Sequence, residues 1–174
     1  MSALYSLVFQ HSEWVHEEDY VKKYPRANSK IDPILFDRGS LTQVLIDLSN
    51  DHFNVNLLRQ EVELPASHES EKLGLKKDEQ AIIREVELQI HHQAVVFARS
   101  VIPLSFVGDT VSQLGTKPLG QLLFKDGKIR VSKREFAEIE TNGQTTLARR
   151  TPYDYEQSQV LVAEYFLPEI LGYL

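Results

Sequence analysis

Alternation of apolar and polar residues predicts two paired strands in the middle of the chain. From Ala81 to Pro103 the sequence reads AIIREVELQIHHQAVVFARSVIP. Two extended stretches flank a short polar turn at His91-His92-Gln93, and successive side chains of a strand point to opposite faces of a sheet. Both faces are rich in apolar residues, so we expect other parts of the protein to cover both.

One charged residue interrupts an apolar face in each of three strands. These residues are Arg84, Arg99 and, near the C terminus, Glu164, and each has an apolar neighbour two positions before and after it. Charged side chains are almost never fully buried without a partner. We therefore expect an anionic group, from the protein or from a ligand, beside the arginines.

A purely structural arrangement would produce the same pattern. Arg84 and Glu164 could form a buried ion pair with no ligand between them, or an arginine stem could pack while its head reaches water. At an edge of the sheet, Arg99 would simply be solvated. The alternation alone leaves these possibilities open.

The remaining pattern predicts an α+β fold. Ser40 to Gln43 matches a capping box, and apolar residues from Leu41 to Leu48 follow with helical spacing. About six strands, joined mostly by hairpins, indicate one antiparallel sheet with helices packed around it. The other predicted elements are a helix in residues 2–24, a connector at 25–33, a strand at 53–64, an exposed helix within 66–80, short helices starting at Ser105 and after Pro118, strands at 129–140 and 145–155 around Asn142-Gly143, and a final strand at 158–167.

Composition fits a single domain spanning residues 1–174. Apolar residues make up 42% and charged residues 25% of the 174 positions, which is ordinary globular usage. A formal net charge of −6 argues against a nucleic-acid-binding surface. The absence of cysteine excludes disulfides and fits a reducing cytoplasm. We expect a soluble cytoplasmic protein, since no signal peptide or membrane-spanning run occurs.

Several common catalytic motifs are missing. Neither GxGxxG nor GxxxxGK[ST] occurs, and GxSxG is also absent. The six histidines lack HExxH spacing, and neighbouring side chains at the His91-His92 turn point apart. We expect neither a metal site nor a redox cofactor.

Several segments resemble one enzyme family. The stretch LGTKPLGQLLF at 114–124 is similar to the LGxxPLGxxLF stretch of bacterial chorismate pyruvate-lyases. The segments IIREVEL, FARSVIP, FAEI, ARR at 148–150 and AEYFLP at 163–168 follow in that family's order and approximate spacing. The resemblance covers Ile31 to the C terminus, and residues 1–30 lie outside it.

The resemblance implies a cofactor-free lyase that converts chorismate to 4-hydroxybenzoate and pyruvate, the first step toward the ubiquinone head group. It also implies a six-stranded sheet with an internal cavity under two flap-like loops. In this family Arg84 would bind the benzoate carboxylate, Glu164 the 4-hydroxyl, and backbone groups at Leu41 and Leu119 would complete the contacts. Leu41 stands where the family has methionine, and Thr116-Lys117 reverses the familiar order, so we expect altered affinity rather than lost activity.

The chemistry of chorismate suggests roles for the arginines. Two carboxylates suit two guanidinium groups, so Arg84 and Arg99 could each hold one end of the dianion. We assign Arg99 the further task of stabilising the departing pyruvate. Arg149 and Arg150 alternate faces, so at most one points inward, and we expect the pair to be mostly on the surface or to support Glu164.

An alternative interpretation is a binding module without catalysis. The effector-binding modules of some bacterial transcription regulators are similar in fold, and fold alone does not determine function. Such modules normally follow a basic helix-turn-helix, and residues 1–30 are too short and too acidic to supply one. We therefore favour a monomeric lyase whose partners are its substrate and product.

Overall fold

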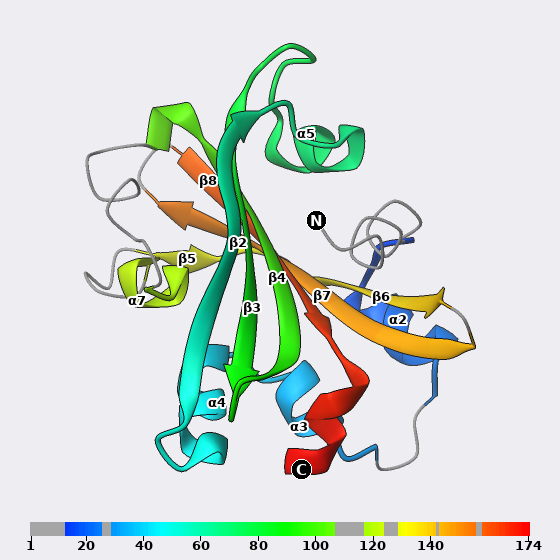
Figure 1. Ribbon diagram of the computed structural model, residues 1–174. Coiled ribbons are helices and arrows are strands. Elements are labelled where there is room, and N and C mark those ends of the chain that lie inside the picture. Colours follow the sequence, from blue (N-terminus) through cyan, green and yellow to red (C-terminus); the bar gives the residue numbers. More distant parts are fainter. Residues whose placement is uncertain (1–12, 26–28, 107–116, 124–128, 142, 156–157) are drawn as a thin grey trace.

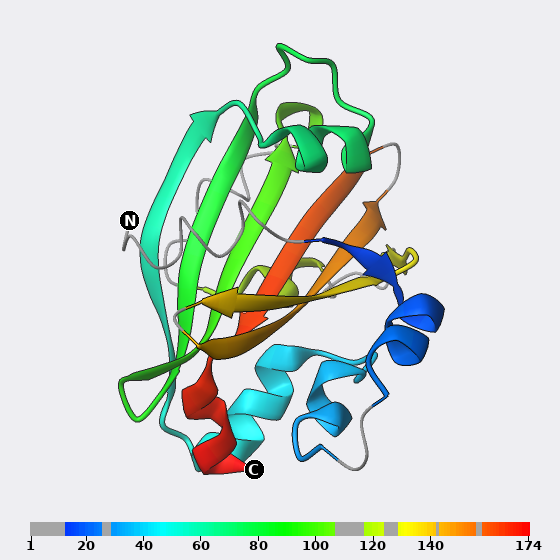
Figure 2. The same cartoon turned by 90° about the vertical axis from the view of Figure 1, so that its right-hand side faces the viewer.

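The computed structural model describes residues 13–25, 29–106, 117–123, 129–141, 143–155 and 158–174 (Figure 1). In these residues a twisted antiparallel sheet carries short helices on both of its faces (Figures 1 and 2). This arrangement confirms the predicted α+β class with a single antiparallel sheet.

The described part of the sheet has eight strands in the order β1-β6-β7-β8-β4-β3-β2, with β5 paired to β7. The predicted number of about six is wrong because β1 and β5 each have two residues, too few for an alternating pattern to register. The predicted strand at 129–140 is divided into β5 and β6. The bounds are β1 (Val15–His16), β2 (Phe53–Glu63), β3 (Ala81–Ile90), β4 (Gln93–Pro103), β5 (Arg130–Val131), β6 (Glu135–Thr141), β7 (Gln144–Tyr155) and β8 (Ser158–Phe166).

The helices that start at Leu41, Ser67 and Leu119 begin close to where the sequence places them. The Ser40 hydroxyl accepts a hydrogen bond from the Gln43 backbone N–H at 3.4 Å, whereas the Gln43 side chain binds Asp47. One half of the predicted capping box therefore forms. The helices are α2 (Glu17–Lys23), α3 (Asp32–Leu35), α4 (Leu41–Ser49), α5 (Ser67–Leu73) and α7 (Leu119–Leu123), with 3-10 turns η1 (Leu104–Phe106) and η2 (Pro168–Tyr173).

Other predicted elements are confirmed only in part. The predicted helix at 2–24 contains strand β1 before α2, and its first residues lie outside the described part of the chain. The predicted connector at 25–33 ends in α3. Most of the helix expected after Ser105, and Asn142 of the hairpin turn, also lie outside the described residues. Helix α5 lies within the predicted range 66–80 and ends before Gly74, whose φ of 64° is left-handed, but it buries Glu69.

A bulge in the central hairpin decides which side chains share a face. The pairing of β3 with β4 shifts by one residue between Leu88 and Gln89, so that Arg84 lies opposite Ser100. An uninterrupted ladder from the turn would place Arg84 opposite Arg99 instead. Because a one-residue shift moves side chains to the other face, the expectation that the two arginines share a pocket is wrong.

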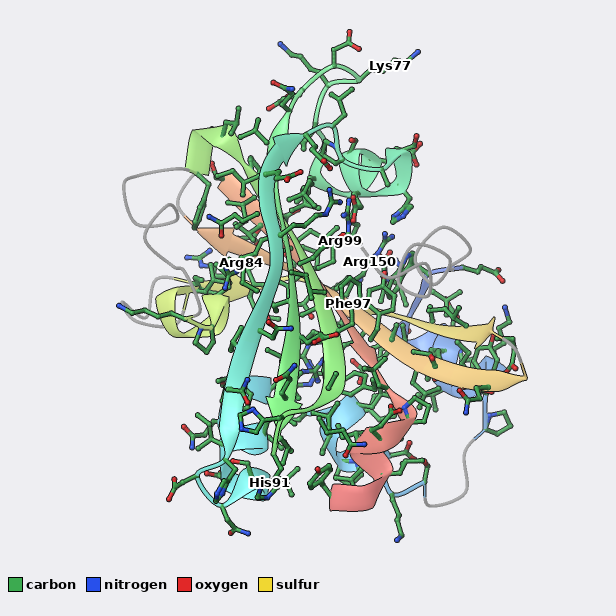
Figure 3. The ribbon with its side chains drawn as sticks, in the orientation of Figure 1. Lys77, Arg84, His91, Phe97, Arg99 and Arg150 are labelled. Atoms are coloured by element: carbon green, nitrogen blue, oxygen red, sulfur yellow. The ribbon has the colours of Figure 1, made fainter. Side chains whose placement is uncertain are left out.

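The two faces of the sheet therefore have different neighbours. We call the face that carries Arg84, Ser100 and Glu164 the cavity face, and the face that carries Glu85 and Arg99 the back face. Helices α4 and α7 lie on the side of the cavity face, whereas α5 lies on the side of the back face (Figure 1). Figure 3 shows Arg84 on the α7 side of the sheet and Arg99 on the α5 side.

Arg99 is buried in an ion-pair network on the back face. Its Nε and one terminal nitrogen donate to both carboxylate oxygens of Glu69 at 2.7 and 2.9 Å, and its Nη1 donates to Glu85 at 2.6 Å. Glu85 also accepts from Arg59 at 2.7 Å. Arg99 is only 4% exposed, and the carboxylates that its guanidinium neutralises belong to the protein. We therefore assign it no part in gripping a ligand in the cavity.

Arg150 belongs to the same face. It donates to Glu135 at 2.6 Å and lies over the Trp14 ring, 4.8 Å from its centroid, while Lys72 also contacts Glu135 at 3.0 Å. Arg149 points to the cavity face, so the two arginines alternate as expected. Both are buried, so of the two alternatives expected for the pair, a surface position or support for Glu164, the surface position is wrong.

Removal of Arg99 tests the structural role of this network. Arg99→Met leaves Glu69 buried without its guanidinium and Glu85 with Arg59 alone, so we expect the free energy of unfolding in urea to fall by about 3–5 kcal/mol. The matched control is Arg38→Met, since Arg38 pairs with Glu17 at the surface with 78% of its side chain exposed, and we expect it to cost about 1 kcal/mol or less. Equal losses for the two variants would contradict the buried role of Arg99.

Acid should weaken the same network. Burial alone would raise the pKa of Glu69, but the hydrogen bonds and charge of Arg99 outweigh it and hold the pKa below its ordinary value of 4.5. A depressed pKa stabilises the fold above the unfolded-state value, and this contribution is lost as the pH falls through the folded-state value. The stability difference between the native protein and Glu69→Gln should therefore shrink below about pH 4.5 in urea titrations.

The exposed Glu61, whose nearest cation is Arg59 at 3.8 Å, supplies the control for that titration. Glu61→Gln should differ from the native protein by a small amount that hardly varies with pH. A Glu69→Gln difference that stayed constant from neutral to acidic pH would show that Arg99 does not hold the Glu69 carboxylate ionised.

Candidate functional site

A cavity lies between the cavity face of the sheet and two segments that cross it. It encloses about 600 Å³ of empty space, the solvent at its mouth included. Residues 39–42 at the start of α4 and residues 118–120 at the start of α7 form one wall, and strands β3, β4, β7 and β8 form the other. Leu41 and Leu119, the two predicted loop contacts, both line it and are both buried.

Arg84 enters the cavity from the middle of β3. Its Nη1 donates to the Gln60 side-chain oxygen at 2.8 Å, and its Nη2 donates to the Lys117 carbonyl at 2.9 Å. These two acceptors are uncharged, and the side chain is only 2% exposed. Burial lowers the pKa of Arg84, which means that the site disfavours the charge it contains. A carboxylate bound beside Arg84 would offset that penalty.

Glu164 reaches the same cavity from β8, where it is 8% exposed. Its Oε2 accepts a hydrogen bond from Arg149 Nε at 2.5 Å, across the β7–β8 pairing. Burial lowers the pKa of Arg149, but the Glu164 charge outweighs this and raises it overall. The pair therefore keeps a carboxylate in position at the cavity, which an isolated buried glutamate could not do.

Arg149 also fixes the chain that leads into the cavity wall. Its Nη1 donates to the carbonyl oxygens of Ile34, Leu35 and Asp37 at 2.9, 3.1 and 2.9 Å. The segment 39–42 begins two residues after Asp37, so the Arg149 guanidinium connects Glu164 to the segment that forms part of the cavity wall. This bears out the expectation that one residue of the Arg149-Arg150 pair supports Glu164.

The sequence analysis did not single out two further residues near Glu164. Tyr153 lines the cavity, and burial followed by the Glu164 charge raises its pKa, so its phenol remains a neutral hydrogen-bond donor. Arg134 is 6% exposed and donates from Nη1 to the Asp37 carbonyl. Tyr153 lies two residues beyond Thr151 on the face of Arg149, so the period of β7 could have indicated it. Arg134 lies outside any strand, where periodicity says nothing.

No three His, Cys, Asp or Glu side chains gather as metal ligands would, within the residues that the structure describes. Over the same residues, no helix combines the length and the apolar character needed to cross a membrane.

The cavity offers the guanidinium of Arg84, the carboxylate of Glu164 and the phenol of Tyr153 among apolar side chains. This set suits a small aromatic or cyclic acid with a hydroxyl group.

Solved structures with a similar fold include transcription regulators. A GntR-family regulator from Bacillus cereus superposes with a TM-score of 0.54 at 10% identity, over 68% of this chain and 93% of that one. A GntR-family regulator from Enterococcus faecalis gives a TM-score of 0.50 at 16% identity, over 66% and 88%. At such low identity the likeness concerns the fold alone.

Sequence comparison connects the chain to a group of enzymes. A protein named "Probable chorismate pyruvate-lyase" from Pseudomonas putida is 35% identical over 98% of this chain and 97% of its own. Proteins of the same name from Aromatoleum aromaticum and Methylococcus capsulatus are each 34% identical, over 90% and 79% of this chain. The family model described as chorismate lyase matches residues 8–172, and so begins well before Ile31, where the resemblance began. The chain belongs to the chorismate lyase family.

Proposed function

We propose that the protein binds chorismate in this cavity and converts it to 4-hydroxybenzoate and pyruvate. The observation that carries the proposal is the presence of Arg84 and Glu164 in one buried cavity of a chain from the chorismate lyase family. The proposal includes the expectations that the protein acts without a cofactor, as a monomer in the cytoplasm, and toward ubiquinone.

In this proposal Arg84 binds the ring carboxylate of the substrate. A guanidinium can grip a carboxylate with two parallel hydrogen bonds, and such charge-assisted bonds are strong in a buried site. Glu164 accepts the hydrogen bond of the ring hydroxyl, and backbone groups at Leu41 and Leu119 hold the ring from the two crossing segments. Apolar lining residues such as Val86 and Val162 suit the flat faces of the ring.

The reaction requires positioning more than added chemistry. The C4–H bond breaks as a proton leaves, its electron pair forms the C3–C4 double bond, and the C3–O pair departs with enolpyruvate, which takes up a proton to become pyruvate. The ring becomes aromatic, so no oxidant or reductant is needed to balance the step. Fixing the reacting groups in a productive orientation can remove about 7–11 kcal/mol from such a barrier.

A non-catalytic binding module is the second candidate, because the GntR-family regulators share the fold. Such a module would hold an acidic ligand in the same cavity and release it unchanged. Binding experiments alone would not separate the two functions, since Arg84 would serve both.

A measurement of chorismate turnover distinguishes the lyase from the binding module. We expect the purified protein, in buffer with a metal chelator, to convert chorismate to 4-hydroxybenzoate and pyruvate in equal amounts. Ultraviolet absorbance measures the aromatic product, and a coupled lactate dehydrogenase assay measures pyruvate. Product formation at the rate of chorismate alone would contradict the lyase and favour the binding module.

Arg84→Gln tests the carboxylate contact. Loss of a hydrogen bond to a charged group costs about 1.5–3 kcal/mol, so we expect 4-hydroxybenzoate to bind about tenfold to a hundredfold more weakly in calorimetric titrations. Arg130→Gln serves as the control, because Arg130 is an exposed arginine on β5 and its loss should leave the affinity unchanged. A folded Arg84→Gln protein with native affinity would remove Arg84 from the site.

A further inference from the structure

The proposed substrate has a second carboxylate that Arg84 cannot also bind. Chorismate carries this group on its enolpyruvyl ether at C3, next to the hydroxyl-bearing carbon C4. If Arg84 binds the ring carboxylate and Glu164 the hydroxyl, the second carboxylate lies at the Glu164 end of the cavity. Arg99 cannot reach it, because Arg99 lies on the back face of the sheet with two glutamates.

Two guanidinium groups lie at the Glu164 end. Arg149 already donates from Nε to Glu164 and from Nη1 to three carbonyl oxygens, so its charge is paired with Glu164 and these two nitrogens are committed. Arg134 is less constrained. It lies in the short break between β5 and β6, and the strand that follows pairs with β7 and brings it toward Arg149.

Arg134 lies beside the residues that line the cavity, is hydrogen-bonded to the chain just before the cavity wall, and has a donor to spare. Its Nη1 donates to the Asp37 carbonyl, the same oxygen that Arg149 Nη1 contacts, and Asp37 precedes the cavity-lining Gly39 by two residues. Its Nε is buried and has no hydrogen-bond partner among the residues that the structure describes. A buried donor without a partner is costly, and an arriving carboxylate would satisfy it.

The local charge favours an anion as well. Burial lowers the pKa of Arg134, and the neighbouring Arg149 lowers it further, against the opposing influence of Tyr153 and Glu164. Arg149 and Glu164 form an ion pair, so Arg134 adds its own positive charge beside that pair. A carboxylate of a dianionic substrate would offset the charge of Arg134.

We propose that Arg134 binds the second, ether-borne carboxylate of the substrate. The inference rests on the proposed function and extends it. This carboxylate departs with pyruvate, so Arg134 would contact the substrate and the leaving fragment but not 4-hydroxybenzoate. Arg134 therefore distinguishes substrate from product, whereas Arg84 binds the carboxylate that both share.

Two aromatic ligands make this difference measurable. 4-Hydroxybenzoate carries only the ring carboxylate, and 3-(1-carboxyethoxy)-4-hydroxybenzoate carries both but has a saturated ether that does not react. In calorimetric titrations Arg134→Gln should weaken the dianion about tenfold or more and change the affinity for 4-hydroxybenzoate by less than about threefold. Arg84→Gln should weaken both ligands. Similar losses for both ligands in Arg134→Gln, or none for either, would overturn the assignment.

Two additions keep the test decisive if Arg134→Gln does not fold. Arg134→Lys retains the charge and should recover part of the affinity for the dianion. With the native protein, the methyl ester of the ether-borne carboxylate should bind about tenfold more weakly than the free acid. Equal binding of acid and ester would show that no cation recognises the second carboxylate.

Failure of this inference is distinguishable from failure of the proposed lyase activity. Chorismate turnover without discrimination between the two ligands would overturn the Arg134 assignment alone. Discrimination that depends on Arg134, with no turnover, would overturn the lyase activity and leave Arg134 as a carboxylate-binding residue.

Discussion

The ion pair between Arg149 and Glu164 holds the site together. Glu164 would be costly to bury as an isolated carboxylate, and Arg149, which is 1% exposed, would be costly as an isolated cation. Their bond at 2.5 Å resolves both problems. Because the same guanidinium also binds three carbonyls between Ile34 and Asp37, it determines where the chain enters the cavity wall. Loss of this contact would disturb the carboxylate and the loop together.

The two faces of the sheet compensate their charges in different ways. On the back face, Arg99 meets Glu69 and Glu85 in short hydrogen bonds, so protein groups neutralise one another and the network is structural. Beside the cavity, burial lowers the pKa of Arg84, and the buried Nε of Arg134 has no hydrogen-bond partner among the described residues. A bound anion would therefore stabilise the arginines there, whereas protein carboxylates do so on the back face.

The sequence predicted the long strands well because their alternation extends over nine or more residues in each case. The exception is the strand predicted at 129–140, which the structure divides into β5 and β6. The alternation also identified Arg84 and Glu164, and the family resemblance added Leu41 and Leu119; all four line the cavity. It could not predict the bulge beside Gln89, since one extra residue in a ladder leaves no mark on an apolar pattern. That single residue moved Arg99 to the other face. The sequence analysis missed Arg134 for another reason, because the position of this side chain depends on a contact with Asp37, which is distant in sequence.

The central claim is that Arg84 and Glu164 bind the two polar ends of one aromatic ring. A crystal structure with 4-hydroxybenzoate measures this most directly. We expect the ring inside the cavity, with its carboxylate within hydrogen-bonding distance of the Arg84 guanidinium and its hydroxyl donating to Glu164. A ring bound on the back face beside Arg99, or an occupied cavity in which Arg84 and Glu164 make no contact with the ligand, would contradict the claim.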